Sequence, residues 1–172
     1  MITGDFSSIF FTQDRIGKNG KYFKMYKFRS MEINADEKLD ELLKNDDKLR
    51  KEYQIYKKLQ YDPRITKTGE FLRKRSLDEF PQFINVLKGE MSLVGPRAYL
   101  PQEKEDMGEA YEYIIKCKPG ITGLWQVSGR NKNTFKQRLM LDLEYYNNRG
   151  LLYDIKIIFK TFFSVFKKEG AM

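Results

Sequence analysis

The stretch SIFFTQDRIGKNGKYFKMYKFRSM, residues 8–31, predicts the first element of the fold. Its two extended halves meet at the sequence GKNG, and an Asn-Gly pair between two such halves is a strong signal for a β-hairpin. Alternation along the second half places Lys27 and Arg29 on one face with Phe23 and Met25. This pattern fits an exposed basic strand end, and it also fits the cationic wall of an anion-binding site.

The rest of the chain reads mainly as helices. Apolar residues recur every three or four positions in residues 32–60 and 134–150, and the acidic segment 101–117 is a further helix candidate. Glycine and proline in residues 87–101 and 118–131 favour loops there. We therefore expect an α+β fold, in which an N-terminal β-hairpin packs with several helices, and a single domain that covers residues 1–172.

The last segment, YDIKIIFKTFFSVFKK, is strongly apolar with one narrow polar stripe. The stripe consists of Lys156, Lys160, Ser164 and Lys167. The segment is too short to span a bilayer, but it suits an amphipathic helix that lies in a membrane interface with its lysines toward the headgroups. A core helix with a wide buried face is the alternative.

Composition excludes several kinds of chemistry. The chain has 32 basic and 24 acidic residues, a formal charge of +8, and no histidine. The positive charge predicts an anionic partner: nucleic acid, a phosphorylated ligand or an anionic membrane. The missing histidine excludes Ser-His-Asp and Cys-His catalysis and His-ligated zinc. Cys117, the single cysteine, cannot form an internal disulfide and suits a reducing compartment.

The octet RSLDEFPQ, residues 75–82, contains the best candidate for catalysis. One interpretation is a helix capping box, with Ser76 as the cap and Glu79 reaching back to it. Pro81 would then be the fifth helical residue, where it costs about 3 kcal/mol. We therefore expect a regular helix to begin at Asp78 or later, with the acidic pair at its N-terminal end, where free N–H groups keep a carboxylate ionised.

Such a pair is chemically suited to phosphate transfer. An ionised carboxylate among cations is a competent nucleophile toward phosphorus, and a second carboxylate beside it can hold Mg²⁺. Arg73 belongs to a cationic cluster just before the pair. Arg97 follows a Gly-Pro turn and Arg130 follows a glycine, so each is either a phosphate contact or an exposed loop arginine.

Three long stretches of the sequence resemble the bacterial sugar transferase family. They are RIGKNGKYFKMYKFRSM, DPRITKTGEFLRKRSLDEFPQFINVLKGEMSLVGPR, and KPGITGLWQVSGRN with the following LDLEYY and DIKIIFKT. The resemblance runs from about residue 9 to residue 161, in the order typical of the monotopic phosphoglycosyl transferases. These motifs are long and specific.

The resemblance implies an enzyme that transfers a sugar-1-phosphate from a UDP-sugar to undecaprenyl phosphate and releases UMP. It implies this reaction at the cytoplasmic face of the bacterial inner membrane, in the first membrane step of capsule, exopolysaccharide or O-antigen synthesis. It also implies residue roles: Asp78 as the nucleophile, Asp78 and Glu79 as the Mg²⁺ site, Lys27, Arg29, Arg73 and Arg97 around phosphate, and Arg130 on the nucleotide. Asp62 and Arg64 of DPRIT are either structural or functional.

This sequence also departs from the family pattern. The family usually begins with an apolar re-entrant membrane helix, whereas this chain starts almost at the segment that follows it, so we expect a shortened chain. The sequence GPRA, which ends in Ala98, replaces the common GPRP. The alternatives are a non-catalytic basic module that binds anions or nucleic acid, and a scaffold that is inactive without its membrane helix. The spacing of the aromatic residues argues against a nucleic-acid partner. The sequence leaves open which sugar is transferred and whether the chain forms a homo-oligomer.

Overall fold

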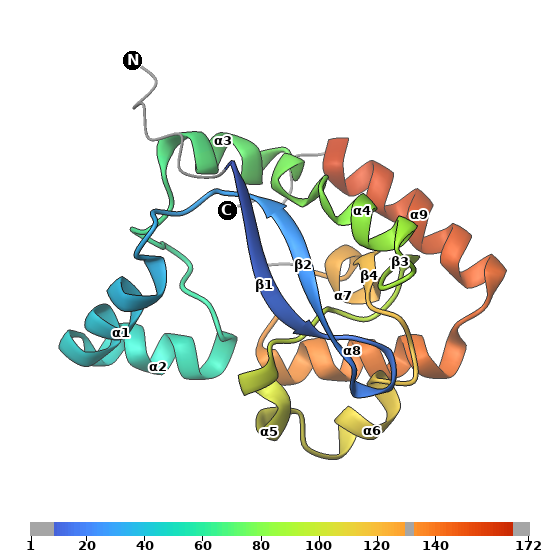
Figure 1. Ribbon diagram of the computed structural model, residues 1–172. Coiled ribbons are helices and arrows are strands. Elements are labelled where there is room, and N and C mark those ends of the chain that lie inside the picture. Colours follow the sequence, from blue (N-terminus) through green and yellow to red (C-terminus); the bar gives the residue numbers. More distant parts are fainter. Residues whose placement is uncertain (1–8, 130–132, 167–172) are drawn as a thin grey trace.

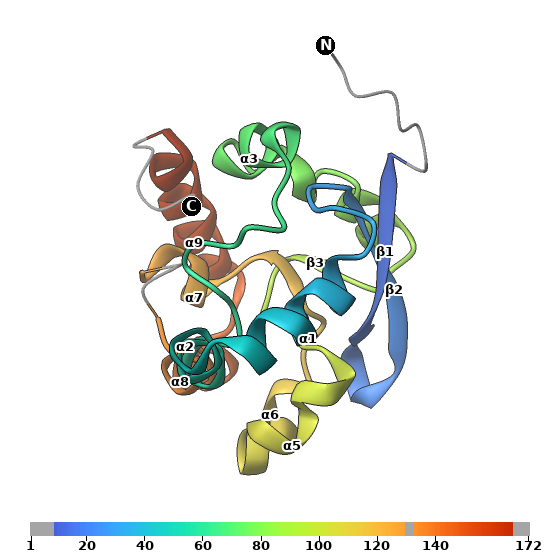
Figure 2. The same cartoon turned by 90° about the vertical axis from the view of Figure 1, so that its left-hand side faces the viewer.

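The computed structural model of the chain describes residues 9–129 and 133–166, and these residues form an α+β fold. The strands are β1 (Phe10–Ile16), β2 (Tyr22–Phe28), β3 (Ser92–Val94) and β4 (Gly120–Thr122); the α-helices are α1 (Ala35–Asn45), α2 (Asp47–Tyr56), α3 (Lys67–Lys74), α4 (Gln82–Leu87), α5 (Lys104–Met107), α6 (Tyr111–Ile114), α7 (Leu124–Val127), α8 (Phe135–Asn148) and α9 (Leu151–Phe166). In Figure 1, α3, α4 and α9 lie along the top and α5, α6 and α8 along the bottom, with the hairpin β1–β2 running between them. After a quarter turn, the hairpin forms one edge of the molecule, on the side opposite α9 (Figure 2).

The predicted hairpin is confirmed. β1 and β2 are antiparallel, with Phe10 opposite Phe28 and Ile16 opposite Tyr22. At the turn, Asn19 and Gly20 both have positive φ, 58° and 74°. Asn and Gly adopt this left-handed conformation more readily than other residues, which explains the strength of the Asn-Gly signal.

Two predicted helical segments are divided. The pattern over residues 32–60 becomes α1 and α2, because Asp46 leaves the helical conformation and its carboxylate accepts hydrogen bonds from the first turn of α2. The acidic segment 101–117 forms only short turns and the helices α5 and α6, separated at Gly108, whose φ is 53° and ψ is −138°. The helix candidate 101–117 is thus helical in part and interrupted, since helical spacing does not reveal such breaks.

A parallel pair of short strands lies inside the segments that we expected to be loops. β3 pairs with β4, with Ser92 opposite Gly120 and Val94 opposite Thr122. Tyr145 of α8 and Ile157 of α9 pack against Val94 and Leu124, which joins this pair to the two C-terminal helices. The loop that carries Arg97 therefore leaves a packed strand.

Helix α9 exposes most of its apolar side chains. Ile157 is buried against the body, whereas Phe159, Phe162 and Phe163 are each about 60% exposed (63%, 60% and 61%). The alternative of a core helix was therefore wrong. Lys167, the last residue of the predicted polar stripe, lies outside the described residues, and no helix within residues 9–129 and 133–166 is both long and apolar enough to cross a membrane.

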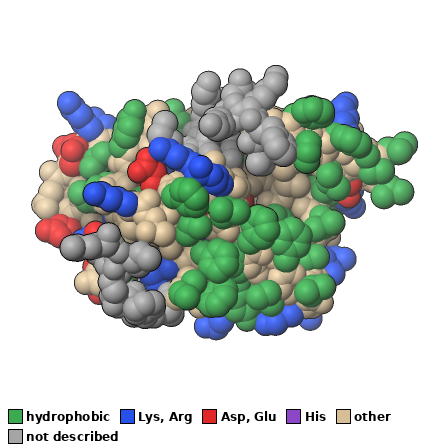
Figure 3. All heavy atoms as spheres, turned by 90° about the horizontal axis from the view of Figure 1, so that it is seen from above, with side chains coloured by type: hydrophobic (Ala, Val, Ile, Leu, Met, Phe, Trp, Pro, Cys, Tyr) green, Lys and Arg blue, Asp and Glu red, His purple; other side chains and the backbone are tan. Residues whose placement is uncertain are grey.

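The exposed apolar side chains of α9 belong to a larger surface. Figure 3 shows the face that is uppermost in Figure 1, where hydrophobic side chains form a broad patch on the side of α4 and α9. Together we call these residues the apolar face: Phe80, Phe83, Ile84, Leu87, Leu151, Leu152, Ile155, Ile158, Phe159, Phe162 and Phe163. It lies on the same side of the molecule as α3, which leads into the predicted acidic pair.

The two ends of the segment between the hairpin and α3 lie side by side. The Glu32 N–H donates to the Arg64 carbonyl at 3.0 Å, and an isolated antiparallel bridge pairs Met31 with Ile65. The Thr66 N–H donates to the Ser30 carbonyl at 3.1 Å. Helices α1 and α2 thus form an excursion whose two ends are joined.

Asn85 attaches α4 to the hairpin. It is fully buried, its Oδ1 accepts from the Tyr26 N–H at 3.1 Å, and its Nδ2 donates to the Lys24 carbonyl at 2.8 Å and to Glu90 Oε2 at 2.7 Å. We expect Asn85→Ala to lower the free energy of unfolding by about 2–4 kcal/mol, because it leaves buried polar groups without partners. Urea unfolding measures the effect, with the exposed Asn147→Ala as control; a loss no larger than that of the control would contradict the prediction.

Candidate active site

A sharp turn carries the acidic pair. After α3, Ser76 adopts a left-handed conformation with φ of 55°, and a 3-10 turn, Leu77–Glu79, follows. Regular helix begins only at Gln82, with Pro81 in the capping position. The helix thus starts after Asp78, as the proline argument required, but Pro81 precedes its first turn, and the side chain of Ser76 caps no helix.

Asp78 is a buried carboxylate among charges. It is 7% exposed, and burial raises the pKa of its carboxyl, while Lys27 and Arg73 oppose this rise and Glu79 adds to it. A backbone hydrogen bond lowers the Asp78 pKa, but its effect is smaller than that of burial. The N–H groups that we expected to keep this carboxylate ionised are thus opposed by its burial. A carboxylate with a raised pKa and little hydration is a stronger base, and this favours nucleophilic attack.

Glu79 is held from two other elements. Its Oε1 lies 3.3 Å from the Lys27 ammonium on β2, and its Oε2 lies 3.5 Å from Gln126 Nε2 on α7. Alternation along β2 correctly placed Lys27 on the same face as the buried Phe23 and Met25. β2 contacts the turn Leu77–Glu79, and Lys27 reaches Glu79 there. Gln126 was not among the predicted site residues.

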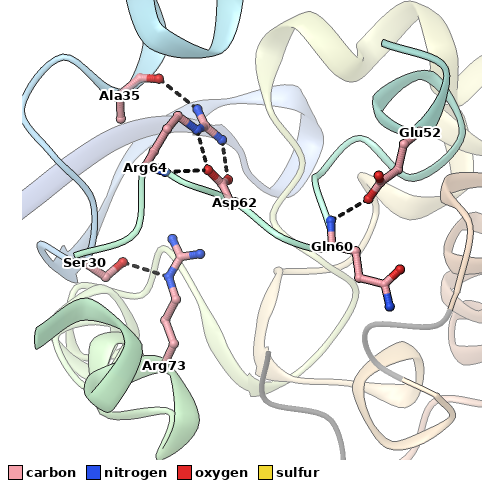
Figure 4. Close-up of polar contacts among 7 residues, drawn as sticks. All are labelled: Ser30, Ala35, Glu52, Gln60, Asp62, Arg64 and Arg73. Atoms are coloured by element: carbon pink, nitrogen blue, oxygen red, sulfur yellow. Dashed lines mark hydrogen bonds and ion pairs between the residues drawn. The ribbon is translucent and has the colours of Figure 1, made fainter. Parts of the chain in front are cut away.

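Arg73 is oriented by Ser30, which follows the second strand of the hairpin. Its Nε donates to the Ser30 hydroxyl at 2.9 Å, and the rest of its guanidinium extends beyond that contact (Figure 4). Burial lowers the Arg73 pKa, and the nearby Asp78 carboxylate opposes this shift. Because a guanidinium has five N–H groups, Arg73 can keep the Ser30 contact and still bind a phosphate.

The motif DPRIT is structural in this chain. The Arg64 guanidinium forms a bidentate pair with the Asp62 carboxylate, with donor–acceptor distances of 2.8 and 2.6 Å, and its Nη1 donates to the Ala35 carbonyl at 2.9 Å (Figure 4). Both side chains are almost completely buried. The pair fixes the segment that lies against Ser30, and through Ser30 it supports Arg73.

Arg97 is fixed through its backbone. Its N–H donates to Asp142 Oδ2 at 3.1 Å, and the Tyr99 hydroxyl donates to the same oxygen at 2.7 Å. Burial raises the pKa of Asp142 to about 7, against the effect of these hydrogen bonds and of nearby arginines. The Arg97 guanidinium lies 5.3 Å from the centre of the Trp125 ring, and Trp125 is the chain neighbour of Gln126.

Two further residues were predicted at the site, Arg29 and Arg130. The Arg29 guanidinium lies 5.8 Å from the centre of the Phe11 ring on the neighbouring strand, so its phosphate contact stays a prediction. Arg130 lies outside the described residues. Sequence reasoning missed Ser30 and Gln126, because a serine or glutamine carries no charge pattern; their positions inside FRSM and LWQVSGR were the only available signals.

The acidic pair fits a magnesium site. Within the described residues, no group of three or more Asp, Glu, Cys or His side chains could hold a metal ion. Mg²⁺, however, is usually bound in proteins by one or two carboxylates together with substrate phosphates and water. The two carboxylates match that donor set, and a buried amide oxygen of Gln126, which has no hydrogen-bond partner among the described residues, lies on the side chain that contacts Glu79.

Comparison with known proteins identifies the family of the chain. The family model described as bacterial sugar transferase matches residues 2–168. Among similar proteins are an uncharacterized sugar transferase of Haemophilus influenzae, 52% identical over 91% of this chain and 33% of its own length, and an undecaprenyl-phosphate galactose phosphotransferase of Salmonella typhimurium, 48% identical over 99% and 36%. An exopolysaccharide production protein of Sinorhizobium fredii is 45% identical over 97% of this chain and 74% of its own length. The chain thus spans about a third of the first two relatives, and it belongs to the bacterial sugar transferase family.

Proposed function

We propose that the chain is the catalytic domain of a phosphoglycosyl transferase, which moves a sugar-1-phosphate from a UDP-sugar to undecaprenyl phosphate. The observation that carries this proposal is a buried Asp78 beside Glu79, with Lys27 and Arg73 close enough to influence its pKa. Two relatives support the proposal: an undecaprenyl-phosphate galactose phosphotransferase supports the lipid substrate, and an exopolysaccharide production protein supports the pathway class.

The proposed reaction has two displacements at one phosphorus. In the first, an Asp78 carboxylate oxygen bonds to the sugar-bearing phosphorus of the UDP-sugar, and the bond from that phosphorus to the bridging oxygen breaks, which releases UMP. In the second, a phosphate oxygen of undecaprenyl phosphate attacks the same phosphorus, and the bond to Asp78 breaks. The products are undecaprenyl diphosphate sugar and free Asp78.

The surrounding residues have distinct parts in this scheme. Arg73 and Arg97 bind phosphate oxygens, and Lys27 balances the charge of the acidic pair. Asp78 and Glu79 hold Mg²⁺, which when bound neutralises phosphate charge as it develops. Burial of Asp78 keeps water from the nucleophile.

The direct test is UMP formation by the chain reconstituted in lipid vesicles. We expect UMP release from at least one member of a panel of UDP-sugars, dependent on undecaprenyl phosphate for multiple turnovers and abolished by EDTA. The panel also identifies the sugar. If no UDP-sugar yields UMP, the proposal fails.

The role of Lys27 predicts a change in pH dependence. Lys27 lowers the pKa of Asp78, so Lys27→Met raises that pKa further. Since Asp78 must be ionised to attack, the acidic limb of the pH profile of kcat/KM should move to higher pH. Lys24→Met, an exposed lysine on the same strand, is the control; equal acidic limbs in wild type and Lys27→Met would contradict the assignment.

We further propose that the apolar face docks the chain on the cytoplasmic face of the bacterial inner membrane. Lys156 and Lys160 are exposed on α9 beside the apolar residues, so they can reach anionic headgroups. Each exposed phenylalanine that enters the interface contributes about 1.5–3 kcal/mol at most.

Vesicle binding tests this docking. Phe159→Ser combined with Phe163→Ser should weaken sedimentation with anionic vesicles by roughly tenfold or more, because two large apolar contacts are lost. Ile55→Ser, which changes an exposed apolar residue on α2, is the control. Equal binding of all three proteins would refute the proposed docking face.

A further inference from the structure

Gln126 contacts the acidic pair from an element that the sequence did not connect with it. Its Nε2 lies 3.5 Å from Glu79 Oε2, while Lys27 occupies the other oxygen of the same carboxylate. The two contacts come from β2 and α7, so the orientation of Glu79 depends on two separate parts of the fold.

The position of Gln126 is fixed by the packing of α7. The preceding Leu124 is buried in a cluster with Val94, Tyr145 and Ile157. At Gly123, a Cβ would lie 2.2 Å from the Gly95 carbonyl oxygen, so the backbone before α7 lies directly against the loop that leads to Arg97. The backbone that carries Gln126 is therefore held in place on the side of the Arg97 loop.

The other end of the Gln126 amide has no hydrogen-bond partner among residues 9–129 and 133–166. Its Oε1 is buried and accepts no hydrogen bond from the described residues. A buried amide oxygen without a partner is unfavourable and is usually explained by a bound water or ion. Amide oxygens are also among the ligands that hard divalent cations accept.

We propose that Gln126 is the third side chain of the Asp78–Glu79 cation site, where it orients Glu79 and presents a neutral oxygen to the divalent cation. This inference rests on the proposed function, which places the cation at the acidic pair. Gln126 is thus a positioning residue for Glu79. A cation at the pair accounts for both observations: the Nε2 group lies near Glu79, and the buried Oε1 accepts no hydrogen bond from the described residues.

The test measures metal binding without turnover. Mn²⁺ alone is titrated into the full 172-residue chain in detergent, and free Mn²⁺ is followed by electron paramagnetic resonance. We expect Gln126→Leu to raise the Kd for Mn²⁺ at the site by roughly tenfold or more, the range found for residues that orient metal ligands. Glu79→Gln defines which binding belongs to the pair, and Gln102→Leu, an exposed glutamine, is the matched control.

A second variant keeps the test decisive if Gln126→Leu unfolds. Gln126→Asn keeps the amide but shortens the side chain by one methylene, so neither the donor nor the oxygen reaches its position and Mn²⁺ binding should weaken. A folded Gln126→Asn or Gln126→Leu with unchanged binding, while Glu79→Gln has lost it, overturns the inference. Equal binding by wild type and Glu79→Gln removes the cation from the pair, and the metal part of the proposed function fails together with this inference.

Discussion

Asp78→Asn is expected to lower UMP release by at least about 10⁴-fold, the scale on which removal of a catalytic nucleophile acts. The amide is nearly the same size as the carboxylate, so it fits the same buried position but cannot form the bond to phosphorus. Without undecaprenyl phosphate, wild type should release a burst of UMP equal to the amount of enzyme and gain the mass of one sugar phosphate. Asp78→Asn should show neither the burst nor the mass change.

The matched control is Asp40→Asn, at an exposed position on α1. It should keep wild-type turnover, which excludes a general effect of removing one negative charge. A stoichiometric burst in Asp78→Asn would show that the nucleophile is another group, even if overall turnover were reduced.

Arg73→Met has the second largest expected effect, a loss of roughly 10²–10³-fold in kcat/KM. The methionine fills a similar volume but removes the positive charge next to Asp78 and the planar set of donors for phosphate. Arg73→Lys should recover part of the loss, because it restores charge without the bidentate geometry. Steady-state UMP release with varied UDP-sugar measures all three proteins.

The neighbouring Lys74→Met is the control for Arg73, since Lys74 is exposed and pairs only with Glu70 among the described ion pairs. Ser30→Ala should have a smaller effect in the same direction as Arg73→Met, because it removes the hydrogen bond to Arg73 Nε and leaves the guanidinium. If Arg73→Met and Lys74→Met were equally active, Arg73 would have no part in phosphate binding.

The elements with strong local signals could be predicted from the sequence. Asn19 and Gly20 marked the hairpin turn, and apolar spacing over residues 134–150 marked α8. Strands β3 and β4 could not be predicted, since three residues each show no usable alternation and their pairing depends on distant packing. The break at Asp46 was also missed, because an aspartate fits within a solvated helical pattern as well as at a cap.

The same distinction applies to the site. Charged residues in distinctive motifs, Asp78, Glu79, Lys27 and Arg73, were named from the sequence, and the structure brings them together. Their neutral partners Ser30 and Gln126 were not. A hydrogen bond across 43 or 47 residues of chain depends on tertiary packing and leaves no periodic trace.

The joined ends of segment 32–64 have a consequence for protein engineering and for natural variation. Because Glu32 and Arg64 are hydrogen-bonded to each other, the length of chain between them can change without altering the distance from β2 to α3. Closing a longer loop costs little additional entropy. A reporter or affinity domain inserted after Asn45, between α1 and α2, should therefore leave the spacing of Lys27, Arg73 and Asp78 intact.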